Sequence, residues 1–134
     1  MIIKTIFFLD VMYYYSHLFY KKLLNQISPS IQPSIILGGI VGIPLGFLVD
    51  TVYIYLSCKA PNPWLFISSC LGCMIFMLYF YEYKDRKSKV IKNEPRFFKS
   101  KRINLFLTIF IDFVVILLLF LNGIVGKYLL NSCQ

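Results

Sequence analysis

Three of the six acidic residues, Asp10, Asp50 and Asp112, lie inside long apolar segments. An ionised aspartate at the centre of a transmembrane helix costs about 2.5–3.5 kcal/mol on insertion scales, so it normally faces protein or water and is a functional candidate. Asn104, Thr108 and Asp112 recur every fourth residue and would share one helix face. In a closed oligomer, this face and Asp50 could line a cation pathway. Alternatively, each aspartate pairs with a tyrosine, an amide or a backbone group on a neighbouring helix.

A second polar stripe lies near the N-terminus, where Asp10, Tyr14, His17 and Lys21 fall on one face of a helix covering residues 1–22. The rest of that helix surface is rich in Ile, Phe, Leu and Tyr. This pattern favours an amphipathic helix that lies in the membrane interface. The alternative is a fourth membrane-spanning helix whose polar stripe turns towards other helices.

A glycine ridge precedes Asp50, because Gly38, Gly42 and Gly46 also recur every fourth residue. Small residues at this spacing let helix backbones approach closely within a membrane. We therefore expect the ridge to pack against another helix, from the same chain or from a second copy. Pro44 lies within the ridge and is expected to bend the helix, because it removes a backbone donor.

The four cysteines divide into two pairs. Cys70 and Cys73 form a CxxC pair inside an apolar segment, without the further cysteines or histidines of a zinc site, and we interpret them as packing residues. Cys58 and Cys133 flank predicted spans and fall on the same side of the membrane. A disulfide between them could form in an oxidising compartment.

No arrangement typical of an enzyme is recognisable. His17 is the single histidine, so neither a Ser/His/Asp nor a Cys/His constellation can be assembled with a familiar spacing. A glycine-rich loop before a Lys-Ser or Lys-Thr pair, which binds phosphate, is also missing. We expect a non-enzymatic protein that uses no cofactor and no metal.

Composition indicates that a membrane must position these residues. Of the 134 residues, 58% are hydrophobic and only 15% are charged, and the mean hydropathy is +0.70. Soluble domains are about a quarter charged. The segments 35–56, 64–81 and 103–121 are long and apolar enough to span a bilayer. We predict an all-α, multi-pass transmembrane helical bundle that forms a single membrane domain over residues 1–134.

Nine of the fourteen Lys and Arg residues lie between two predicted spans, in the basic segment 84–102. The positive-inside rule places this segment in the cytoplasm and the C-terminus on the extracytoplasmic side of the inner membrane. Anionic lipid headgroups explain the charge without duplex nucleic acid. Within the segment, a helix is expected to begin at Asn93, with Glu94 and Pro95 in its first turn. The candidates for binding lipid or another anionic ligand are Lys84, Arg86, Lys87, Lys89, Lys92, Arg96, Lys99, Lys101 and Arg102.

The aromatic opening FLDVMYYYSHLFYKK, the apolar spans behind it and the segment YFYEYKDRK resemble small uncharacterised multi-pass bacterial membrane proteins. Such proteins are similar in size and layout to the membrane-disrupting or channel-forming effectors of anti-phage defence systems. That resemblance implies an inner-membrane effector with a partner enzyme that makes a nucleotide signal. This chain differs in having no obvious soluble sensor domain, so the basic segment is the evident place for a ligand.

Two functions are compatible with these patterns. The first is a homo-oligomeric pore or ion-conducting membrane effector, with Asn104, Thr108 and Asp112 along the path and the glycine ridge at helix contacts. The second is a non-catalytic accessory or scaffold subunit of a larger membrane complex. A small transporter is disfavoured because three or four helices without an internal repeat do not match the usual transporter architecture.

Overall fold

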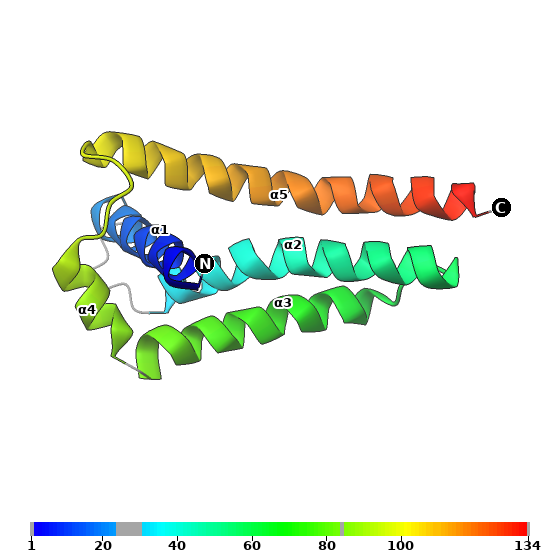
Figure 1. The fold of residues 1–134 in the computed structure, drawn as a ribbon, viewed down its shortest axis with the longest axis horizontal. Helices are drawn as coiled ribbons and strands as arrows, with labels where there is room; N and C mark the ends of the chain where they lie inside the picture. Colours follow the sequence, from blue (N-terminus) through cyan, green and yellow to red (C-terminus); the bar gives the residue numbers. More distant parts are fainter. Residues whose placement is uncertain (1, 24–30, 84, 134) are drawn as a thin grey trace.

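The computed structural model describes residues 2–23, 31–83 and 85–133 as a bundle of helices (Figure 1). These residues contain no strand, and three of the helices are long and apolar enough to cross a membrane, so the predicted all-α bundle is confirmed. In chain order, the elements are α1 (Ile2–Leu23), α2 (Gln32–Ser57), α3 (Pro63–Leu78), the π-helix η1 (Tyr79–Tyr83), α4 (Arg86–Asn93) and α5 (Lys101–Ser132).

The body of the protein consists of α2, α3 with η1, and α5, which run lengthwise beside one another (Figure 1). These are the three helices with the length and composition of membrane spans, and they contain the predicted segments 35–56, 64–81 and 103–121. Their length and apolar composition identify an integral membrane protein. One end of the bundle carries α4 and the start of α5 and is called the basic end. The other, where α2 and α5 finish, is called the disulfide end.

The last helix continues well beyond the predicted end of its span at residue 121 and finishes at Ser132. Past residue 121, the Asn122 side chain donates a hydrogen bond to Asp50 of α2, and Gly126 faces Ile54 of α2. These contacts with α2 stabilise the extra turns, and 32 residues at about 1.5 Å each make α5 longer than the hydrocarbon core.

The glycine ridge packs against α3 of the same chain. A Cβ atom at Gly42 would lie 2.9 Å from the Cys70 Cα, and one at Gly46 would lie 2.7 Å from the Phe66 ring. Gly38 meets the Met74 backbone in the same way. Larger residues would therefore force the two helices apart, as expected for small residues at a membrane helix contact. Both free cysteines of the CxxC pair lie partly buried along this contact.

The turn between α2 and α3 follows from local signals. Cys58 adopts a left-handed conformation with φ 49° and ends α2, donating its N–H to the Ile54 carbonyl at 2.8 Å. Asn62 then caps α3, because its side-chain oxygen accepts a hydrogen bond from the Trp64 N–H at 3.1 Å. Pro63 occupies the first turn of α3, where its missing donor is tolerated. The short turn leaves α2 and α3 antiparallel and in close contact.

The N-terminal helix crosses the long helices at the basic end, where Figure 1 shows it strongly foreshortened between α5 and α2. It contacts α2, α4 and α5, and it is not among the three helices with the character of a membrane span. Tyr14 and His17 of the predicted stripe are only 4% and 7% exposed, while Lys21 is exposed. Most of the stripe is thus covered by the bundle, whereas an interfacial helix would turn it to water.

The basic segment forms the short helix α4, which ends at Asn93. The predicted helix start at this residue is wrong. Glu94 adopts a left-handed conformation with φ 43° and closes α4 through its N–H to the Val90 carbonyl. Pro95 explains the outcome, because a proline disfavours the helical region for the residue before it. Beyond it, Phe97 packs on Phe8 of α1 at a ring distance of 5.6 Å, which attaches the segment to the bundle.

Candidate functional site

Asp10 is held at the basic end by three hydrogen-bond donors. Arg86 of α4 donates from Nη2 to Oδ2 at 2.7 Å and from Nε to Oδ1 at 3.0 Å, and the Tyr81 hydroxyl donates to Oδ1 at 3.0 Å. The Arg86 guanidinium also lies 4.8 Å from the centre of the Phe80 ring, within cation–π range. Its hydrogen bonds to Asp10 raise the pKa of Arg86 above the ordinary value. Asp10 therefore joins α1, η1 and α4, which gives it a structural role.

Asn104 is the polar centre of the junction between α1 and α5. Asn104 is 0% exposed. Its side-chain amide donates to the Tyr15 hydroxyl at 3.1 Å and to the carbonyls of Phe98 and Ser100. Its oxygen accepts the Phe98 N–H at 2.9 Å. Thr108, one turn further, donates to the Asn104 carbonyl at 3.0 Å. Both side chains point into the bundle and have partners within the chain.

Asp112 differs from its two neighbours on the predicted polar face. Its carboxylate is half-buried, and its Oδ1 atom has no hydrogen-bond partner among the described residues. The side chain borders a cavity of about 130 Å³ between α1, α5 and the first turns of α2, which is also lined by Tyr15, Ser16 and Thr108. The Ser16 hydroxyl likewise has no partner among the described residues. Two polar groups without partners thus meet one small cavity, which is large enough for water at about 30 Å³ per molecule.

Asp112 also borders a groove of about 260 Å³ that separates α5 from α2. The walls are Gly39 and apolar side chains, and a Cβ at Gly39 would have a single contact, 3.9 Å from the end of the Met74 side chain. Because α3 packs on the ridge face of α2, it does not fill this groove. A carboxylate within a membrane span therefore faces an incompletely filled apolar groove.

Asp50 lies near the disulfide end and is 6% exposed. Its Oδ2 accepts a hydrogen bond from the Asn122 amide at 3.0 Å, whereas Oδ1 has no partner among the described residues. Both residues line a crevice of about 400 Å³ between α2, α3 and α5. The structure does not bring Asp50 and Asp112 to one site, because they border separate cavities.

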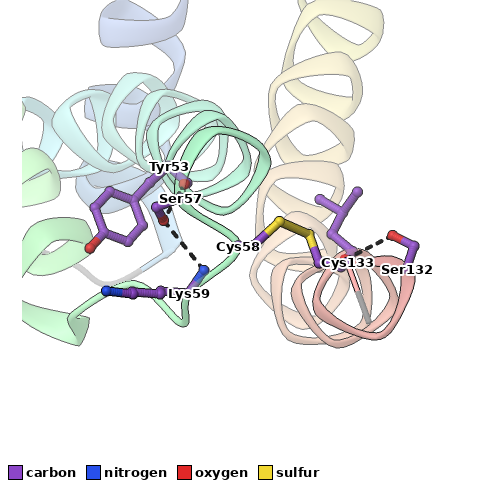
Figure 2. The surroundings of a disulfide bond; sticks show 7 residues. Tyr53, Ser57, Cys58, Lys59, Ser132 and Cys133 are labelled. Carbon is purple, nitrogen blue, oxygen red and sulfur yellow. Dashed lines mark hydrogen bonds between the residues drawn. A yellow bond between two sulfur atoms is a disulfide. The ribbon is translucent and has the colours of Figure 1, made fainter.

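A disulfide joins Cys58 to Cys133, with the two Cα atoms 5.8 Å apart. Figure 2 shows how it ties the end of α2 to the end of α5. Beside it, the Ser57 hydroxyl donates to the Tyr53 carbonyl at 2.7 Å and accepts the Lys59 N–H at 3.4 Å. The sequence allowed this disulfide without deciding whether it forms. The structure contains it, between two cysteines that lie 75 positions apart in the chain.

The basic residues fall into two groups. Four have carboxylate partners: Arg86 with Asp10, Lys87 with Glu82, and both Arg96 and Lys101 with Glu94. Lys84 lies outside the described residues. The candidates without an ion pair among the described residues are Lys89, Lys92, Lys99 and Arg102. This second group remains available for anionic lipid headgroups.

Several functional partners were missed by sequence reasoning. Arg86 was counted only as part of the basic segment, and Asn122 lies just past the predicted end of the third span at residue 121. Tyr15 and Ser16 were two among many polar and aromatic residues of the N-terminal helix. No spacing pattern reveals these pairs, because each joins residues from different helices. In the part of the chain that the structure describes, no three His, Cys, Asp or Glu residues are grouped to hold a metal ion.

Comparisons of the chain with protein-family models, curated proteins and solved structures found no match. The function must therefore be inferred from the polar groups that the bundle places within the membrane.

Proposed function

We propose that the protein is a homo-oligomeric, ion-conducting membrane protein in which Asp112 faces the conduction path. The observation that carries this proposal is the Asp112 side chain, which borders a groove between α2 and α5 and whose buried Oδ1 has no hydrogen-bond partner in the described chain. Asp112 lies about 17 Å along α5 from its start at Lys101, which corresponds to the middle of a bilayer. An ionisable group at this depth needs water or a partner.

The need for more than one copy follows from how the single chain is packed. The glycine ridge of α2 is occupied by α3, and Asn104 and Thr108 bond within the chain. Among the described residues, only α2 and α5 line the groove beside Asp112. A second copy could provide a third wall, and copies around an axis would place their carboxylates in a ring, an arrangement that attracts cations. In this form of the proposal, Asn104 and Thr108 support the path and Asp112 lines it.

The orientation in the membrane is part of the same proposal. We place the basic end in the cytoplasm, where Lys89, Lys92, Lys99 and Arg102, which have no ion pair among the described residues, meet anionic headgroups. The disulfide end then faces the extracytoplasmic side. The Cys58–Cys133 bond supports this assignment, because disulfides persist in oxidising compartments and are rare in the cytosol. The membrane is thus proposed to be the inner membrane of the cell.

The decisive experiment is cation flux through proteoliposomes containing the purified chain. We expect wild-type flux to fall severalfold, or to lose its preference for cations, in Asp112→Asn. The matched control is Asp85→Asn, because Asp85 is exposed at the basic end and asparagine tolerates its left-handed conformation with φ 50°. A folded, correctly inserted wild type that conducts nothing under an applied voltage would contradict the proposal, as would a monomer in several mild detergents. Either result would favour the accessory-subunit function.

A further inference from the structure

The crevice at the disulfide end is large enough for a ligand. It opens between the last turns of α2, the first turns of α3 and the C-terminal part of α5, and measures about 400 Å³. Small-molecule sites typically measure about 300–1,000 Å³. A Cβ at Gly123 of α5 would meet nothing within 4 Å, and one at Gly126 would lie 3.6 Å from the Ile54 side chain. These glycines leave space open, whereas the ridge glycines of α2 permit close helix contact.

Asp50 forms a buried acidic wall of this crevice. Only one of its two carboxylate oxygens has a hydrogen-bond partner in the described chain. Oδ2 accepts a hydrogen bond from the Asn122 amide, whereas Oδ1 is buried without a partner. Burying a charge is costly unless it is paired and hydrogen-bonded. The Asp50 carboxylate therefore has room for a further hydrogen-bond donor, and a positively charged donor would also balance its charge.

Lys127 lines the same crevice from α5 and is exposed. No ion pair links it to Asp50 or to another described carboxylate. The crevice thus presents a buried negative group and a separate, more accessible positive group. Most other described lining residues are apolar, including Ile54, Phe66, Ile67 and Leu130.

We propose that this crevice binds the headgroup of an aminophospholipid, with its primary ammonium on the Asp50 carboxylate and its phosphate beside Lys127. The two charges of such a zwitterion match the two charged residues in sign and in order of burial. The apolar walls suit the carbon atoms between and beyond these charges. Because α2, α3 and α5 are the spanning helices, the crevice borders the bilayer, which supplies the ligand.

The same chemistry selects ethanolamine over choline. A quaternary ammonium has no N–H and cannot donate a hydrogen bond to the Asp50 carboxylate. Proteins that bind quaternary ammonium groups surround them with several aromatic faces, and Phe66 is the one aromatic residue among those described along the crevice. A glycerol headgroup has a phosphate but no positive charge for Asp50. The site should therefore distinguish three phospholipids with identical acyl chains.

The test measures which lipids the full-length chain retains from an equimolar mixture of phosphatidylethanolamine, phosphatidylcholine and phosphatidylglycerol, using native mass spectrometry. We expect severalfold enrichment of phosphatidylethanolamine on the wild type and its loss in Asp50→Asn, which keeps an acceptor for Asn122. Asp112→Asn is the matched control and should keep the enrichment, so this test is separate from ion conduction. Equal retention of ethanolamine and choline lipids by the wild type would overturn the proposal.

A second variant keeps the test decisive if Asp50→Asn fails to fold. Gly123→Leu fills the crevice from a position with open space and leaves the Asp50–Asn122 hydrogen bond intact. We expect it to abolish the enrichment, and unchanged enrichment would refute the site. At equal concentration, soluble phosphoethanolamine, which has no acyl chains, should be retained severalfold less than phosphatidylethanolamine. Equal retention would assign the crevice to a free zwitterion and overturn the lipid proposal.

Discussion

Asp10 of α1 and Arg86 of α4 form a two-point ion pair although 76 positions separate them in the chain. The pair is partly buried, and the Tyr81 hydroxyl adds a third hydrogen bond. It connects the N-terminal helix to the basic segment at one end of the bundle.

Removing one member of this pair should be costly. We expect Arg86→Ala to destabilise the protein by about 1–3 kcal/mol, below the full cost of breaking a completely buried pair. Lys87→Ala is the control, because its ion pair with Glu82 is long, at 3.5 Å, and should contribute less than about 1 kcal/mol. Denaturant titration of the detergent-solubilised protein measures both variants. Equal effects would show that the Asp10–Arg86 pair has no special role.

Asn104→Ala should destabilise the junction between α1 and α5. The substitution leaves the buried Tyr15 hydroxyl and the Phe98 backbone without their partner, at a cost of about 1–3 kcal/mol. Thr108→Val removes a single hydrogen bond to a carbonyl and should cost about 0.5–1.5 kcal/mol. Unfolding curves compare the two, and limited proteolysis reports on the segment before α5. A smaller effect for Asn104→Ala than for Thr108→Val would contradict this interpretation.

The glycine ridge predicts opposite outcomes for two glycine-to-alanine changes. In Gly42→Ala, the new methyl group would lie 2.9 Å from the Cys70 Cα, and relieving that overlap should cost about 1–3 kcal/mol. In Gly72→Ala, the methyl group would enter open space on α3 and should raise stability by up to about 1 kcal/mol. Both are measured by thermal or denaturant unfolding. A neutral Gly42→Ala would mean that α2 and α3 are not in close contact.

The disulfide predicts how the four cysteines react. Under denaturing, non-reducing conditions, an alkylating reagent should modify Cys70 and Cys73 alone, and all four cysteines after reduction. Mass spectrometry counts the modifications. Cys58→Ser should lower stability by about 2–4 kcal/mol through loss of the cross-link, while Cys70→Ser serves as the thiol control. Modification of Cys58 without reductant would show that the bond does not form.

Glu94 predicts a dependence of stability on pH. Hydrogen bonds from Arg96 and then Lys101 lower the pKa of this exposed carboxyl below its ordinary value. Its contribution is fully present above the unfolded pKa of about 4.3 and is lost as pH falls through the lower folded pKa. Wild type should therefore exceed Glu94→Gln in stability at neutral pH, and the two should converge in acid. Unfolding curves across that pH range test this prediction. A stability difference between wild type and Glu94→Gln that widens in acid would mean that folding raises the pKa of Glu94 instead of lowering it.

Composition and spacing alone determined the class of this protein and its three spans. Long apolar segments can be recognised without knowing what they contact, because lipid solvates them wherever they lie. The glycine ridge was recognisable for a similar reason, since close backbone approach requires small residues at a helical repeat. Its partner helix was not, because Gly42 fits any suitable helix and only the fold places Cys70 opposite it.

Tertiary structure decided everything that depends on contacts between distant residues. Asp10 pairs with Arg86, Asp50 accepts a hydrogen bond from Asn122, and Asn104 donates one to Tyr15. Asp112 Oδ1 has no partner among the described residues. All four lie in helices that the sequence predicts, yet their chemistry differs. The physical reason is that hydropathy is a property of each segment, whereas satisfying a buried polar group requires a partner from another helix. The same principle explains why α5 continues past residue 121 and why most of the polar stripe of α1 is buried. In both cases contacts with other helices, which the local sequence does not reveal, determined the structure.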